Sequence, residues 1–490
     1  MTQDGLSQFI NLVKSPGDSL RQKALHSGFW AGFLNVSDRG LQIFKLLILG
    51  NILAPASFGI LGIALLTKMM LWQLTQLGLN TALIQQKEEN IDEYLDTAWS
   101  INLFRGLCIF AAVFVTAPFI ADVFREPLAG PVIQVIGISV ILDSLINPAT
   151  VYFQKELEFY KEYIFNFSKS IVDVVVTITA ALIWQSVWAL VVGLLLSGVV
   201  KVIASYLLHS YRPKLAFKTE KAKEMLTFGK WIWVTSLVTF MATSGDDAFV
   251  GWYLSAGALG LYQMAFRLSN APATEVTQTI ASVSLPLFSK LQDDKNRLKK
   301  AYLRMFGLTS VIGLPMAIGI ILVAPEFTEF ALGDKWIEMV PAMQIMAIAG
   351  LFRAYGKTGG VLFQGYGSPH WDFRMNLVRV ITIIVSIAPL TSRWGITGTA
   401  LAITLGMGSA LPIWAFKSKE ITQAKVSDFI EHLLPAAVAT AIMMVPVSII
   451  VAPTLMHIVA AVFCGIGVYT IILASVYQFQ GRSLLAELIS

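Results

Sequence analysis

Two cations lie one helical turn apart in an otherwise apolar stretch of the chain. Arg353 and Lys357 occur near the middle of residues 341–362. If this stretch crosses a bilayer, each cation costs roughly 2.5–3.5 kcal/mol at the helix centre. Membrane proteins keep such side chains where they face a watery cavity or a partner. The pair therefore predicts an anion-binding site, and the alternative is an internal salt bridge to Asp143.

Polar side chains also recur on single helical faces of other apolar stretches. Asn35, Asp38, Gln42 and Lys45 follow helical spacing in the first stretch. We predict ligand contacts at a set of basic and amide residues: Arg353, Lys357, Arg267, Arg39, Gln42, Asn270, Gln73 and Gln76. We predict ion coupling at a set of carboxylates: Asp38, Asp143, Asp246, Asp247 and Glu275.

Local pairing is the alternative reading of several of these charges. Arg39 could pair with the adjacent Asp38, and Asp246 with Asp247 could cap a helix end. Arg267 could pair with Asp246, Asp247 or Glu275. For the cations nearer the span ends we expect snorkelling to the interface; these are Lys45, Lys68, Lys169, Lys201 and Arg304.

The composition predicts that membrane helices position these residues. Of the 490 residues, 56% are hydrophobic and only 14% are charged, with a mean hydropathy of +0.67. A soluble domain has about 25% charged residues, and a helical span needs about 20 apolar residues. We predict an all-α integral membrane protein with about fourteen spans, at 25–48, 57–83, 97–120, 131–152, 163–184, 187–208, 230–253, 258–285, 302–323, 340–363, 372–391, 394–416, 430–451 and 454–477.

The distribution of cations between loops predicts the orientation. One set of loops holds 21 Lys and Arg residues, and the other holds only Arg125, Lys335 and Arg393. Because short basic loops stay in the cytoplasm, both termini are predicted to be cytoplasmic. The predicted parts are a lead-in (1–24), a six-helix bundle (25–208), a basic linker (209–229), a second six-helix bundle (230–416) and a terminal helix pair with its tail (417–490).

The two predicted bundles resemble each other in sequence. A shift of 201 residues places Gly28 and Trp30 on Gly229 and Trp231. A shift of 210 places Phe153, Gln154, Glu162, Asn166 and Lys169 on Phe363, Gln364, Asp372, Asn376 and Arg379. The later shift also places Asp143 on Arg353. Six spans separate the copies, so we predict parallel repeats around a central cavity, as in some transporters.

Motifs for catalysis and cofactors are absent from the sequence. It contains neither a phosphate-binding GxxxxGK[ST] loop nor HExxH. The two cysteines, Cys108 and Cys464, lie in apolar stretches, which indicates neither a disulfide framework nor a metal cluster. We predict that the protein is not an enzyme and needs no cofactor or metal.

Several stretches resemble the multidrug/oligosaccharidyl-lipid/polysaccharide exporter superfamily. They are residues 53–61, 83–87, 153–159, 228–231, 287–293 and 333–336. The likeness is greatest to the polysaccharide transporter branch, with its Wzx-type oligosaccharide flippases of the colanic-acid exporter type. It implies transfer of an undecaprenyl-pyrophosphate-linked oligosaccharide to the periplasmic leaflet of the inner membrane, by alternating access, for surface polysaccharide synthesis.

A pyrophosphate cannot cross hydrocarbon unaided, and cations offer it charge-assisted hydrogen bonds. We therefore expect Arg353, Lys357 and Arg267 to engage it. The expected partners are the lipid-linked oligosaccharide, membrane lipids, a polysaccharide polymerase and assembly proteins, without nucleic acid. The alternatives are a multidrug-type antiporter, a membrane glycosyl-polymerase, and a scaffold in an assembly complex.

Overall fold

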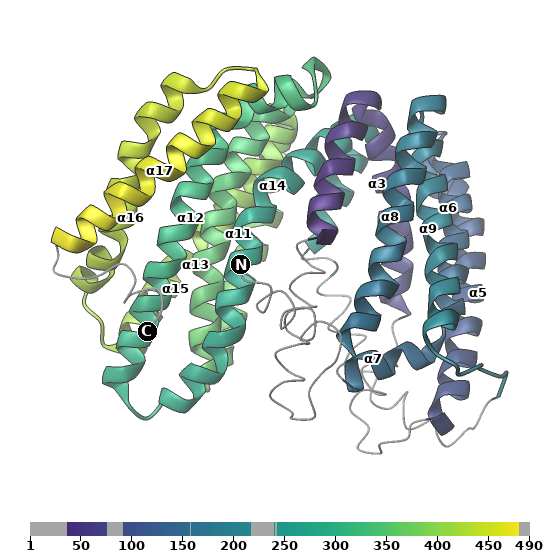
Figure 1. Cartoon of the computed structure of the whole chain (residues 1–490), viewed down its shortest axis with the longest axis horizontal. Coiled ribbons are helices and arrows are strands. Elements are labelled where there is room, and N and C mark those ends of the chain that lie inside the picture. Colours follow the sequence, from purple (N-terminus) through teal and green to yellow (C-terminus); the bar gives the residue numbers. More distant parts are fainter. Residues whose placement is uncertain (1–36, 76–91, 157, 217–239, 241–242, 480–490) are drawn as a thin grey trace, which may run out of the picture. The chain divides into compact units, whose positions relative to one another are not determined.

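The computed structural model describes residues 37–75, 92–156, 158–216, 240 and 243–479. These residues form helices connected by short turns, and none of them lies in a strand. The chain divides into two compact units, Met1–Gly257 and Ala258–Ser490, each of which is a helical bundle (Figure 1).

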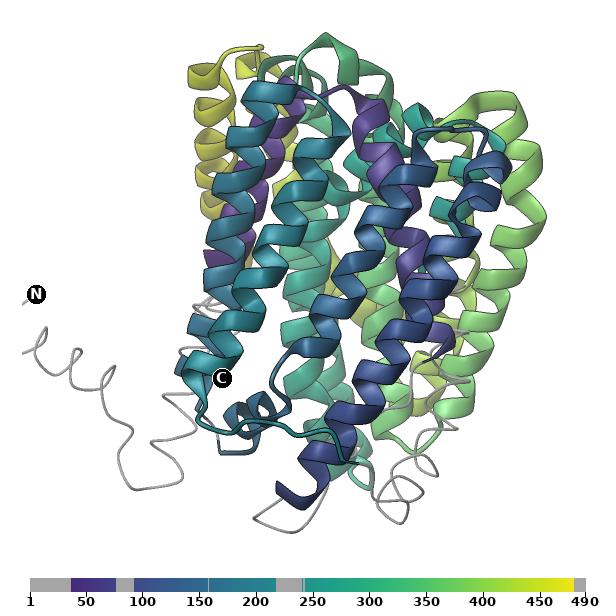
Figure 2. The ribbon, with the colours of Figure 1, turned by 90° about the vertical axis from the view of Figure 1, so that its right-hand side faces the viewer.

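The helices of the first unit are long and mostly apolar. Besides residues 37–52 and 243–253, they are α3 (Pro55–Leu74), α5 (Asp92–Val123), α6 (Ala129–Leu145), η1 (Pro148–Thr150), α7 (Val151–Lys155), α8 (Phe159–Trp184) and α9 (Val187–Leu208). Helices α8 and α9 pack along each other, as do α5 and α6, while α6 also contacts α3 and α9 (Figure 2).

The second unit continues this pattern. Its helices are α11 (Ala256–Leu291), α12 (Lys295–Ala331), η2 (Asp334–Met339), α13 (Val340–Gly365), α14 (Pro369–Ser409), α15 (Leu411–Thr422), α16 (Val426–Ile450) and α17 (Leu455–Phe479). Helix α13 packs against α12 and α14, and α16 packs against α12 and α17. This arrangement places α13 within the bundle.

The tight turns expected from the sequence are present. Helix α8 ends at Trp184 and is capped by Gln185, which has a left-handed φ of 48°, and α9 begins at Val187. Within α14 the helical geometry breaks at Trp394 and Gly395, whose φ of 55° suits glycine. The predicted turn at 184–187 is therefore confirmed, and the break predicted at 391–394 lies at Trp394 and Gly395.

The described helices fit a multi-span membrane protein. Nine of them are long and apolar enough to cross a membrane, or ten if the bent pair α6 and α7 counts as one span. The predicted first and seventh spans extend into residues outside the described part of the chain. The all-α multi-span class is confirmed, and the number fourteen stays a prediction.

One predicted span departs from a straight helix. Residues 131–152 were expected to form a single span, but α6 ends at Leu145 and the chain bends by 68° before η1 and α7. Pro148 explains the break, because proline disfavours helical geometry in the residue before it. The side chain of that residue, Asn147, accepts a hydrogen bond from the backbone N–H of Ala149.

The two units share a polar arrangement at the positions of the predicted repeat. In the first unit Gln154 donates to Glu162 over 2.8 Å, and Asn166 donates to the backbone oxygen of Glu162 over 3.1 Å. In the second unit Gln364 donates to Asp372 over 2.9 Å, and Asn376 donates to the backbone oxygen of Asp372 over 2.9 Å. Equivalent positions therefore make equivalent bonds.

Candidate functional site

Helix α13 presents the two cations that the sequence singled out. Arg353 donates to the side-chain oxygen of Asn270 on α11 over 2.5 Å, and its guanidinium lies 5.4 Å from the centre of the Phe266 ring. Two predicted ligand-binding residues, Arg353 and Asn270, are thus brought together. Lys357 is exposed one turn further along and forms no ion pair with a described residue.

An aromatic and hydroxyl network holds the other side of α13. Tyr355 stacks on Trp414 with centroids 5.8 Å apart, and its hydroxyl lies 3.0 Å from that of Ser310. Trp414 donates to the Tyr302 hydroxyl, which donates to Ser418, both over 2.8 Å. Since position 355 is about 200° around the helix from 353, this network fixes the rotation of α13 and so the direction of its cationic face.

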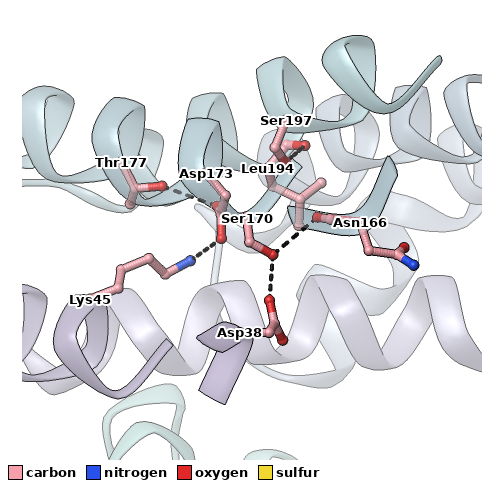
Figure 3. Close-up of polar contacts among 8 residues, drawn as sticks. All are labelled: Asp38, Lys45, Asn166, Ser170, Asp173, Thr177, Leu194 and Ser197. Carbon is pink, nitrogen blue, oxygen red and sulfur yellow. Dashed lines mark hydrogen bonds and ion pairs between the residues drawn. The ribbon is translucent and has the colours of Figure 1, made fainter. Parts of the chain in front are cut away.

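A second polar cluster lies inside the first unit (Figure 3). The Lys45 ammonium pairs with Asp173 on α8 over 2.5 Å, and Thr177 donates to the same carboxylate over 3.2 Å. Ser170 donates to Asp38 in a short hydrogen bond. The structure thus connects the predicted coupling residue Asp38 to α8.

Sequence reasoning did not identify Asp173 and Ser170 as functional. Asn166, Ser170, Asp173 and Thr177 follow each other at intervals of three or four residues, so they share one face of α8. This spacing is visible in the sequence and indicates a polar face on the helix.

Two lysines expected to snorkel are paired instead. Besides Lys45, Lys68 on α3 forms an ion pair with Asp143 on α6 over 2.8 Å. The expectation of snorkelling was wrong for both, because each has a carboxylate within reach on a neighbouring helix. Asp143 therefore has a cationic partner in its own unit.

The other predicted residues occupy varied environments. Arg39 and Arg267 are exposed and Gln42 is half-buried, as are Asp246 and Asp247 in the helical residues 243–253. The side-chain oxygen of Gln73 on α3 is buried without a hydrogen-bond partner in the described structure, so a ligand donor could satisfy it. Gln76 lies outside the described residues, and so does the side chain of Glu275.

Curated relatives of the chain are named for polysaccharide pathways. The lipopolysaccharide biosynthesis protein WzxC of Escherichia coli (strain K12) is 26% identical over 390 residues, which cover 79% of this chain and 78% of WzxC. The succinoglycan biosynthesis transport protein ExoT of Rhizobium meliloti (strain 1021) is 22% identical over 359 residues, which cover 73% of this chain and 72% of ExoT.

A solved structure shares the fold. The lipid II flippase MurJ in its inward closed conformation superimposes with a TM-score of 0.75 over 92% of this chain and 99% of that chain, at 14% identity. The sequence model of the polysaccharide biosynthesis protein family matches residues 48–341, more than half of the chain. The chain therefore belongs to the polysaccharide biosynthesis protein family.

Proposed function

We propose that this protein is a flippase for lipid-linked oligosaccharides. It moves repeat units on undecaprenyl pyrophosphate from the cytoplasmic to the periplasmic leaflet, and it makes or breaks no covalent bond. Membership of a polysaccharide biosynthesis family and a relative named as a transport protein support this proposal. The chain lies in the inner membrane with both termini in the cytoplasm.

The observation that carries the proposal is the exposed cation of α13. Lys357 lies exposed in a membrane helix without an ion pair to a described residue. Lys45 and Lys68, by contrast, are each neutralised by a carboxylate on another helix. An uncompensated cation in a span needs an anion, and the pyrophosphate supplies one.

The remaining predicted residues take supporting roles in this proposal. Arg353 and Arg267 add donors for the phosphate oxygens, and Arg39 with the amides of Gln42, Asn270, Gln73 and Gln76 contacts the headgroup and its sugars. Asp38, Asp143, Asp246, Asp247 and Glu275 are candidates for coupling to an ion. The two halves alternate in opening to either side of the membrane.

Transport by purified protein in liposomes tests the proposal. Flipping of a fluorescent lipid-linked oligosaccharide is measured for the wild type and for R353A/K357A, with K335A/R393A as a control that removes two cations from the predicted periplasmic loops. We expect the first variant to lose flipping while reconstituting normally, and the control to retain it. Equal flipping by all three proteins would overturn the site assignment.

A further inference from the structure

A polar cavity lies inside the first unit. Its volume is about 190 Å³. It lies where α5, the end of α6, η1, α7 and the start of α8 meet, and the polar residues that line it include Asn102, Asp143, Asn147, Gln154 and Glu162. Because Lys155 and Lys161 belong to the predicted cytoplasmic loops, this is the predicted cytoplasmic end of the bundle.

The break after α6 shapes this cavity. Residues on both sides of the break, from Asp143 to Val151, contribute to its wall. In the second unit the matching helix α13 continues without interruption to Gly365, because no proline occupies the position equivalent to Pro148. The first unit therefore differs from the second unit at the point of the repeat where the cavity lies.

The equivalent carboxylates of the two units, Glu162 and Asp372, also differ in their hydrogen bonds. In the second unit, both oxygens of Asp372 accept hydrogen bonds, one from Gln364 and one from Asn376 over 3.4 Å. In the first unit, one oxygen of Glu162 accepts from Gln154, whereas Oε2 is buried without a donor in the described structure. A buried carboxylate oxygen that lacks a donor is costly, so a bound group is expected to supply one.

Other groups that suit a polyhydroxyl ligand line the same cavity. The indole of Trp99 on α5 offers an aromatic surface there, while its N–H is within reach of the Tyr206 hydroxyl on α9. An alcohol group can donate to the Glu162 oxygen, and it can also accept from a side-chain amide such as that of Asn102. A molecule with several hydroxyls therefore matches the unpartnered carboxylate oxygen and the amides of the lining.

A small cation fits these observations less well. Asp143 is already neutralised by Lys68, and the other lining groups include amides that donate as well as accept. The cavity would hold several waters at about 30 Å³ each, which is more room than a bare ion fills. Gln154 is exposed and the Asp143 side chain is 36% exposed, so solutes can reach the lining.

We propose that this cavity binds one sugar ring of the oligosaccharide at the cytoplasmic side, with Glu162 accepting a hydroxyl hydrogen bond. This inference rests on the proposed flippase function and adds a sugar subsite to the pyrophosphate site. Trp99 contributes an aromatic ring, and Asn102 and Gln154 contribute amide donors and acceptors to sugar hydroxyls.

Binding to protein in nanodiscs tests the proposal with two kinds of lipid. One is undecaprenyl pyrophosphate alone, and the other is the same lipid carrying a single glucose, galactose or N-acetylglucosamine. We expect at least one sugar-bearing lipid to bind the wild type more tightly than the bare lipid. E162Q should lose about tenfold of that affinity, as expected for a charge-assisted hydrogen bond, while its affinity for the bare lipid stays unchanged.

Asp372→Asn is the matched control, because it alters the equivalent carboxylate of the second unit, which lines no part of this cavity. It should bind both lipids like the wild type. If E162Q does not fold, N102A takes its place. Sugar-bearing lipids that bind no more tightly than the bare lipid, or an equal loss for both lipids in E162Q and N102A, would overturn the sugar subsite. Failure of the bare lipid to bind the wild type would instead contradict the pyrophosphate site.

Discussion

At the scale of single residues, the central feature is whether the charge of an intramembrane cation is neutralised by a carboxylate of the same protein. The partners of Lys45 and Lys68 are 128 and 75 residues away in the chain. No local pattern could reveal these pairs, since they depend on which helices become neighbours. Arg353 and Lys357 could be singled out from the sequence, because a charge within an apolar span is visible without knowledge of the fold; their role as a ligand site stays a prediction.

The pair between Lys45 and Asp173 gives a stability prediction. Their side chains are only 19% and 14% exposed, so D173N leaves a largely buried ammonium without its counter-ion. Removing one partner of such a pair costs about 3 kcal/mol or more. We expect D173N to lower the Tm of the purified protein in detergent, and K45M/D173L to recover most of the loss. Single and double variants that both unfold at the wild-type temperature would show that the pair contributes nothing.

At the scale of helices, the sequence predicted most bounds within a few residues. The apolar length of a span is a strong signal, and turns such as that at Gln185 are visible as interruptions. The departure of α6 from a full span was missed, because Val151–Phe153 is apolar and extends the hydrophobic stretch past Pro148. The polar face of α8 is visible as a regular spacing of polar residues, but its partners Asp38 and Lys45 lie on a helix distant in sequence and could not be predicted from that spacing.

Close helix packing gives a prediction for two glycines. A Cβ on Gly193 of α9 would lie 1.8 Å from the Thr177 hydroxyl on α8, whereas a Cβ on Gly467 of α17 would meet no atom within 4 Å. Overpacking costs about 1–3 kcal/mol. We expect G193A to lower the Tm and to disturb the bond from Thr177 to Asp173, while G467A keeps the wild-type Tm. The same Tm for G193A and G467A would contradict the close contact of α8 and α9.

At the scale of the whole molecule, the loop charges predict the topology. Single cysteines are introduced at residues 297 and 393 in a protein whose Cys108 and Cys464 are replaced by serine. In intact cells, a membrane-impermeant thiol reagent should label position 393 and spare position 297, which lies in a basic loop. The reverse labelling would place the termini on the other side of the membrane.

The central claim is that α13 holds a phosphorylated lipid headgroup through its cations. The most direct measurement is the affinity of the protein in nanodiscs for undecaprenyl pyrophosphate, compared between the wild type and R353A/K357A over a range of salt concentrations. Charge-assisted bonds to two cations predict a loss of at least 100-fold in the variant. They also predict that the affinity of the variant depends less on salt concentration than that of the wild type, because fewer protein charges contact the pyrophosphate. Unchanged affinity in R353A/K357A would contradict the account.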